Sequence, residues 1–261
     1  MSLSPEIILL LLFGAAFLAG FIDSIAGGGG LIAVPALLLA GLTPLETLAT
    51  NKLQSLFGSG SATIAYAQKG YVDLRQQAPY AFMAAAASVL GAFSASLIPG
   101  DMFRAFLPIL LIVIALYFAL KPNMTDVDRV ARFSPSTICV AVMPFVAFYD
   151  GIFGPGAGSF YMLAFIALAG FGVLKATAHT KLLNFASNVG AFAAFSVLGV
   201  INWKIGLIMA VGQFFGARLG AAFAMKRGAK IIKPLLVIVC TVLAVKLLTE
   251  SDNPLRVFFG I

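Results

Sequence analysis

The stretch Phe21 to Leu31, FIDSIAGGGGL, sets a carboxylate and a run of four glycines inside an otherwise apolar block. The same arrangement returns at 148–158 as FYDGIFGPGAG, with Asp150 in the place of Asp23. Because glycine runs let a helix break and its backbone unwind, each stretch predicts a discontinuous helix. A charge inside a membrane costs several kcal/mol, so both aspartates are candidates for a functional site.

A second pair of motifs indicates that the chain is duplicated. The sequence ATNKL at 49–53 returns as AHTKL at 178–182, which places Lys52 and Lys181 at matching positions. The two lysines lie 129 residues apart and the two aspartates 127 residues apart. Glycines recur at the distance of the lysines: Gly70 with Gly199, and Gly91 with Gly220. We therefore predict two structural repeats of similar length.

The composition places the chain in a membrane. Hydrophobic residues make up 61% of it and charged residues 10%, against about 25% charged in soluble domains. Uncharged stretches such as 24–45 and 76–100 approach the roughly 20 residues that one helical crossing needs. A β-barrel would alternate in short segments instead. We predict an all-α, polytopic transmembrane bundle of about ten apolar segments.

Apolar segments can be drawn along the whole chain. They lie near 7–25, 31–42, 45–68, 76–98, 103–120, 134–153, 157–171, 173–199, 203–225 and 229–249. The segments 31–42 and 157–171 are short and follow the glycine breaks, so each could cross fully or form half of a re-entrant hairpin. We interpret the first segment as a transmembrane helix rather than a removed signal peptide. The predicted units are a repeat over 1–120, a connector over 121–133 and a repeat over 134–261.

The distribution of basic residues predicts the orientation of the repeats. If every segment crosses, most Lys and Arg residues fall on one side, which the positive-inside rule makes cytoplasmic. That side holds the connector 121–133 and the loop 226–233. An odd number of crossings in each half then predicts that the two repeats are inverted relative to each other. The net charge of +7 is mainly this topology signal, and nothing favours a nucleic-acid partner.

The two lysines are the strongest candidates for binding an anion. Each lies about eight residues into its segment, on the order of 12 Å deep, where an ammonium cannot easily reach the interface. Each should therefore meet either a carboxylate or an anionic substrate. The predicted substrate-binding residues are the two lysines, polar neighbours on the same segments and glycines of the two breaks: Lys52, Lys181, Asn51, Gln54, His179, Thr180, Asn184, Asn188, Gly28, Gly29 and Gly156.

Three further charged residues have open roles. Asp23 and Asp150 could orient the lysines, carry a proton or cap backbone amides. Pairing with a lysine favours the ionised carboxylate, so we expect weak proton coupling. Arg218 has no counterpart in the other half, and it could mark a gate or reach a helix carbonyl. We predict no cofactor and no metal, since Cys139 and Cys240 lack ligand spacing and His179 is the only histidine.

Several phrases resemble the TauE/SafE family of sulfite exporters, in particular its YfcA-like branch. They are FIDSIAGGGGL, PALLLAGL, LATNKLQ, FYDGIFGPGAGSF, KATAHTKLLN and GQFFGARLG. The resemblance covers nearly the whole chain. It implies a bacterial inner-membrane transporter of about eight helices, associated with export of sulfite and small organosulfonates. Together with the ten apolar segments this gives about 8 to 10 membrane segments, with some glycine-flanked pieces expected to be half-helices.

These observations predict a secondary transporter, not an enzyme, that exports a small sulfur oxyanion by alternating access around a central two-lysine site. A membrane potential that is negative inside would favour outward movement of an anion. A channel, or a transporter of another small solute such as an amine, remains open if the aspartates neutralise both lysines. An intramembrane aspartyl protease fits poorly, because its GxGD element is absent and the duplicated lysines would have no role. The expected partners are a small anion and the lipid bilayer, and a homo-oligomer is compatible with the sequence.

Overall fold

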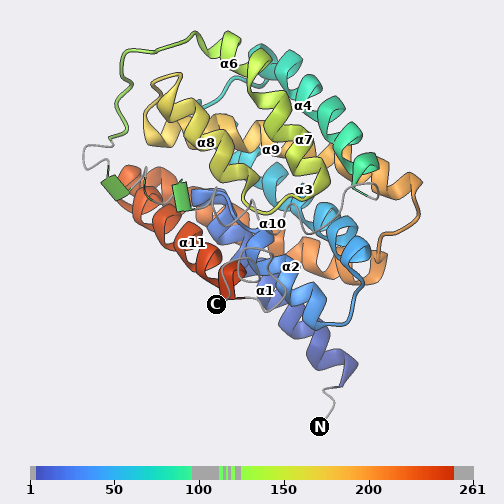
Figure 1. Ribbon diagram of the computed structural model, residues 1–261. Coiled ribbons are helices and arrows are strands. Elements are labelled where there is room, and N and C mark those ends of the chain that lie inside the picture. The colour runs from blue at the N-terminus through green and yellow to red at the C-terminus, as the bar shows by residue number, and fades with distance from the viewer. Residues whose placement is uncertain (1–3, 96–111, 114–115, 117–118, 121–124, 250–261) are drawn as a thin grey trace.

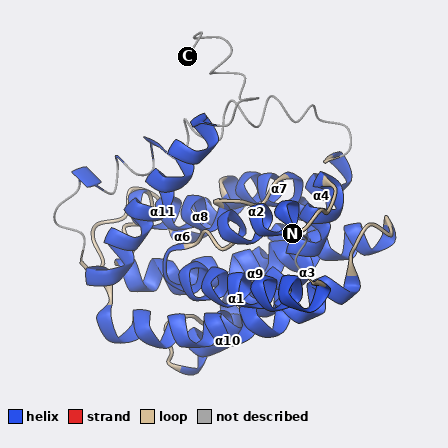
Figure 2. Ribbon diagram, turned by 90° about the horizontal axis from the view of Figure 1, so that it is seen from below, coloured by secondary structure: helices blue, strands red, loops and turns tan. Residues whose placement is uncertain are grey.

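The computed structural model describes residues 4–95, 112–113, 116, 119–120 and 125–249, and these ranges hold helices and no strand (Figures 1 and 2). The helices are α1 (Pro5–Ala26), α2 (Gly30–Leu39), α3 (Pro44–Gln68), α4 (Leu74–Ser94), α6 (Pro135–Ala141), α7 (Met143–Ile152), α8 (Ala157–Ala167), α9 (Val173–Val197), α10 (Trp203–Arg227) and α11 (Ala229–Thr249). The predicted helical membrane bundle is confirmed. The predicted segment 103–120 lies largely outside the described residues.

Helix length separates spanning helices from half-helices. Among the described residues, α1 and α10 are long and apolar enough to cross a membrane. The pair α6 and α7, bent by 40° where they meet, is apolar enough to be either a broken span or a re-entrant loop. In contrast, α2 has 10 residues and α8 has 11. At 1.5 Å per residue each reaches roughly half of a 30 Å hydrocarbon core. As single helices, α2 and α8 are too short to cross the hydrocarbon core fully. Of the two alternatives for segments 31–42 and 157–171, this favours half of a re-entrant hairpin.

The packing of the first half recurs in the second. The first helix α1 packs on α10, and α7 packs on α4 in the same way, while α3 and α9 cross at the centre (Figure 1). The close approaches match in detail. A Cβ at Gly91 would lie 2.1 Å from the Phe148 carbonyl oxygen, and one at Gly220 would lie 2.3 Å from that of Phe21. Only glycine permits these contacts. The backbone of α1 therefore packs directly on α10 at Gly220, and the backbone of α7 packs directly on α4 at Gly91.

The connector between the halves is pinned by two carboxylates. Asp126 accepts hydrogen bonds from the amides of Leu174 and Ala229, at the starts of α9 and α11. Asp128 accepts from the Gly172 amide at 2.8 Å and pairs with Lys175. Partial burial would raise the pKa of Asp128, but the Gly172 amide and the Lys175 ammonium outweigh it and the pKa lies below its ordinary value. The connector and the α10–α11 turn therefore lie at one end of the bundle.

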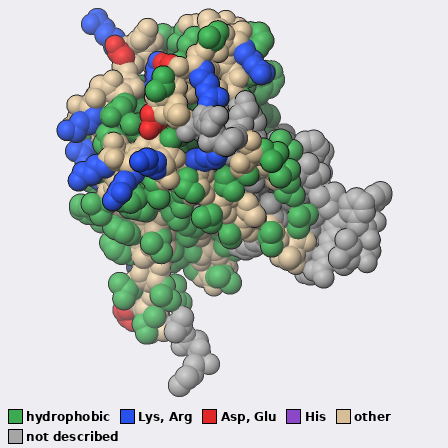
Figure 3. Space-filling model, turned by 90° about the vertical axis from the view of Figure 1, so that its left-hand side faces the viewer, with side chains coloured by type: hydrophobic (Ala, Val, Ile, Leu, Met, Phe, Trp, Pro, Cys, Tyr) green, Lys and Arg blue, Asp and Glu red, His purple; other side chains and the backbone are tan. Residues whose placement is uncertain are grey.

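Charge and apolar surface are separated on the face of Figure 3. Lys and Arg side chains gather over its upper part, and hydrophobic side chains cover the part below. Large apolar side chains of α1 and α10, among them Leu10 and Phe215, are more than half exposed. Exposed apolar surface of this extent suits contact with lipid rather than water.

Candidate functional site

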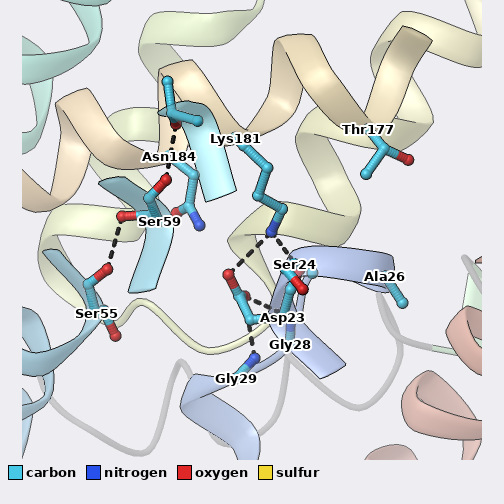
Figure 4. Close-up of polar contacts among 12 residues, drawn as sticks. Asp23, Ser24, Ala26, Gly28, Gly29, Ser55, Ser59, Thr177, Lys181 and Asn184 are labelled. Carbon is cyan, nitrogen blue, oxygen red and sulfur yellow. Dashed lines mark hydrogen bonds and ion pairs between the residues drawn. The ribbon is translucent and has the colours of Figure 1, made fainter. Parts of the chain in front are cut away.

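Four buried charged side chains meet where the helices break, and their pairing crosses between the halves. Lys52 Nζ of α3 lies 2.6 Å from Asp150 Oδ1 of α7. Lys181 Nζ of α9 lies 2.9 Å from Asp23 Oδ2 of α1, and Figure 4 shows this ammonium reaching down to the carboxylate. The lysines are 1% and 0% exposed. Both ammonium groups are therefore held by carboxylates in this conformation.

Helix geometry explains why the lysines arrive at the same depth. Lys52 and Lys181 each stand eight residues after the first residue of a 25-residue helix. The helix bounds thus agree with the predicted spacing of about eight residues from the start of each segment. Because α3 and α9 pack against each other near the centre, both lysines point into the bundle rather than toward lipid.

A polar cavity lies between the two breaks, with an empty volume of about 320 Å³ including the part open to solvent. Both aspartates, one lysine, serine and asparagine side chains and glycines of the breaks line it: Asp23, Gly28, Gly29, Gly30, Asn51, Lys52, Ser55, Asp150, Gly154, Gly156, Gly158, Asn184 and Asn188. The breaks touch directly, since a Cβ at Gly27 would lie 2.6 Å from the Gly158 carbonyl carbon. Gly27 also has a φ of 70°, which glycine adopts readily.

Backbone amides hold Asp23. Its Oδ1 accepts from the amides of Gly28 and Gly29 at 3.0 and 3.1 Å, and its Oδ2 accepts from Lys181 (Figure 4). The Lys181 ammonium also donates to the Asp23 carbonyl oxygen. Gly28 and Gly29 were predicted to bind substrate, but in this structure their amides donate to the Asp23 carboxylate.

Side chains alone hold Asp150 in the described contacts. Its Oδ1 accepts from Lys52, and its Oδ2 accepts from the Ser187 hydroxyl. The difference from Asp23 follows from the sequence. Pro155 stands where the first half has Gly28, and proline has no N–H to donate. Ser187 in turn stands where the first half has Gly58.

Polar side chains around the cavity come from both α3 and α9. Asn51 Oδ1 accepts from Gln54, and Asn184 Oδ1 accepts from Asn188, so in both cases the amide nitrogen remains as a donor. Ser55 and Ser59 are the repeat counterparts of Asn184 and Asn188 at the distance of 129 residues. Applying that distance to the predicted asparagines would have found both serines, which the sequence analysis missed. Ser187 was missed because its counterpart is a glycine.

Some predicted site residues lie outside the cavity lining. His179 packs on Phe165 and Phe171 and meets Gln77 through Nδ1. Arg218 is exposed on α10 and donates to Gln68 at 3.0 Å. Three others are buried behind the lining: Gln54, Thr180 and Lys181.

Charge balance limits what this arrangement can bind. Two ammonium and two carboxylate groups sum to zero, so these side chains make the site neutral although it contains four charges. The amide nitrogens of Asn51 and Asn184 line the cavity as donors, which suits the oxygens of a small solute. In the described residues, His, Cys, Asp and Glu form no group of three that could hold a metal, and Cys139 is a buried free thiol.

Comparison with known proteins gives a consistent result. The family model described as "Sulfite exporter TauE/SafE" matches residues 12–247. The chain is 61% identical over 253 residues to "Probable membrane transporter protein ORF9" of Sinorhizobium sp., with 97% of each chain covered. It is 47% identical to "Probable membrane transporter protein YfcA" of Escherichia coli K12, over 95% of this chain and 92% of that protein. No solved structure matches.

Proposed function

Since the chain belongs to the TauE/SafE family of membrane transporters, we propose that it is a secondary transporter that exports a small sulfur oxyanion or organosulfonate. The observation that carries the proposal is the cavity at the two helix breaks, where a buried lysine and several amide donors face one space. Glycine breaks in matching positions of two repeats are typical of a transporter's substrate site. The expected localisation is the bacterial inner membrane.

In this proposal the Lys52 ammonium neutralises the charge of the anion. The side-chain amides that line the cavity donate hydrogen bonds to its oxygens. The Lys52 ammonium reaches the cavity directly, while Lys181 stands behind Asp23 and adds positive potential. Asn51 and Asn184 present amide nitrogens because their oxygens already accept hydrogen bonds. Hydrogen bonds between charged and polar groups fix the position of an oxyanion better than charge alone.

Alternating access would follow from inverted repeats. The recurring contacts α1 on α10 and α7 on α4 support two repeats related by a pseudo-two-fold axis, because exchange of the two halves reproduces the same packing. The distribution of basic residues is what favours inversion. We place the connector and the loop 226–233 in the cytoplasm. Asp126 bonds the connector to the start of α11, so both must lie on one side.

Cysteine labelling tests the inversion at two matched positions. Arg75 and Lys204 are exposed and stand second in α4 and α10, at equivalent places in the repeats. In a background with both native cysteines replaced, Lys204→Cys should react with an impermeant reagent in intact cells. Arg75→Cys and Val130→Cys of the connector should react only after permeabilisation. Equal labelling of Arg75→Cys and Lys204→Cys would contradict inverted repeats.

Counterflow in proteoliposomes tests the substrate. Radiolabelled methanesulfonate, a sulfonate that stays monovalent, should exchange across vesicles that contain the protein and not across empty ones. Dimethyl sulfone has nearly the same shape and no charge, so it should compete poorly. The balanced ion pairs favour one rival, a transporter of uncharged or amine solutes. Equal or better competition by dimethyl sulfone would support that rival.

A further inference from the structure

The two ion pairs are not equivalent, although the repeats are. We infer, resting on the proposed anion transport, that Asp150 takes up a proton when an anion binds Lys52, so that anion and proton cross the membrane together. Asp23 and Lys181 stay paired throughout and hold the first break in place. The inference follows from the partners of each carboxylate.

The partners of Asp23 suit only its ionised form. Gly28 and Gly29 present backbone N–H groups, which donate and cannot accept. If Asp23 Oδ1 carried a proton, its O–H donor would face the N–H donors of Gly28 and Gly29. The two hydrogen bonds from these amides would then be weakened or lost. Lys181 is fully buried and also bonds the Asp23 carbonyl, so it has little freedom to leave. This pair is fixed by the backbone of α1.

The partner of Asp150 suits both of its forms. The Ser187 hydroxyl donates to Asp150 Oδ2 and also lies 3.0 Å from the Asn184 carbonyl oxygen. A hydroxyl can donate one hydrogen bond and accept others. When Asp150 is protonated, Ser187 can donate to Asn184 and accept the new O–H of the carboxyl. The Ser187 hydroxyl and the carboxyl O–H of Asp150 then both have hydrogen-bond partners.

Charge explains why the proton arrives with the anion. An anion at Lys52 would share one ammonium with the Asp150 carboxylate, and the Asp23 carboxylate also lines the cavity. A second negative charge in a buried site is costly unless it is neutralised. A proton supplied by the buffered solution, through the part of the cavity that is open to solvent, forms an O–H bond on Asp150. The contact of Asp150 with Lys52 is then released. Lys52 then donates to the anion, and the site again sums to zero.

The groups that face Asp150 from neighbouring helices do not offer another proton acceptor. They are Lys52 of α3, Ser187 of α9, Tyr161 of α8 and, beside it on α7, Tyr149. Phenols and hydroxyls stay neutral near pH 7. A monovalent anion that moves with one proton carries no net charge. Its export would then follow the combined concentration gradients of the anion and the proton rather than the membrane potential, in contrast to the expectation from sequence.

Calorimetry on the purified full chain counts the protons. Methanesulfonate is titrated into the protein in several buffers of different ionisation enthalpy, and the slope of heat against that enthalpy gives the protons taken up. About one proton per bound anion is expected for the wild type, since one carboxylate changes state. Asp150→Asn should take up about none, because an amide already resembles the protonated acid. Asp128→Asn, in the connector, is the matched control and should still take up about one.

The outcomes separate the inference from the proposed function. Wild-type binding without proton uptake overturns the inference and leaves anion transport standing. Uptake that persists in Asp150→Asn, or disappears in Asp23→Asn instead, also overturns it. Failure of the wild type to bind methanesulfonate or sulfite overturns the proposed function and the inference with it. If Asp150→Asn does not fold, Ser187→Ala decides: loss of the acceptor should weaken binding about tenfold, and unchanged affinity contradicts the assigned path.

Discussion

Lys52→Ala is expected to lower methanesulfonate counterflow by at least about 100-fold, the equivalent of about 3 kcal/mol. The ammonium is the one positive charge that lines the cavity in the described structure, and a methyl group cannot replace it. The variant also leaves Asp150 buried without its partner, which costs about 3 to 5 kcal/mol when the carboxylate stays ionised. Transport and protein abundance should therefore be measured together, on vesicles matched for protein content.

Double variants distinguish a loss of anion binding from a loss of folded protein. Lys52→Ala with Asp150→Asn removes both members of the pair, so it should restore abundance without restoring transport. Lys52→Ala with Asp23→Asn is the matched control, because Asp23 pairs with Lys181 and its neutralisation relieves nothing at Asp150. If the Lys52 and Asp150 double variant transports methanesulfonate well, Lys52 is a structural residue and not the anion's partner.

Much of the fold could be predicted because it depends on local patterns. The apolar segments are long enough to read from hydropathy, and the glycine breaks at 27–30 and 154–158 indicate where helices stop. Most helix ends agree with the segments, since side chains such as Thr43 and Asn202 accept the first free amides of α3 and α10. The bend that divides 134–153 into α6 and α7 has no glycine to signal it.

The pairing of the site could not be predicted, because it depends on how the halves cross. Along the chain, Lys52 is nearer to Asp23 than to Asp150, and each half holds one of each charge. Packing of α1 on α10 and of α7 on α4 carries each aspartate into the other half. The repeat distance gives equivalent positions and not contacts. The structure is likewise needed to show that the Gly28 amide donates to Asp23. It also shows that Pro155, at the equivalent position, has no N–H to donate to Asp150.

Lys181→Ala is expected to reduce stability more than it changes substrate affinity. Lys181 is 0% exposed, and its ammonium bonds both the side chain and the backbone carbonyl of Asp23. Removing it leaves a buried carboxylate at the first break, at a cost of about 3 to 5 kcal/mol. Thermal unfolding in detergent, followed by size-exclusion chromatography, should show a marked loss of folded protein.

Lys181→Ala with Asp23→Asn should recover most of that stability. The asparagine oxygen can still accept from the Gly28 and Gly29 amides, and no charge is left unpaired. Lys181→Ala with Asp150→Asn is the matched control and should recover none, since Asp150 is bonded to Lys52 and Ser187. Recovery by Asp150→Asn but not by Asp23→Asn would contradict the crossed pairing. Because each pair joins the first helix region of one half to the lysine helix of the other, the result also tests whether the two halves are locked together through these charges.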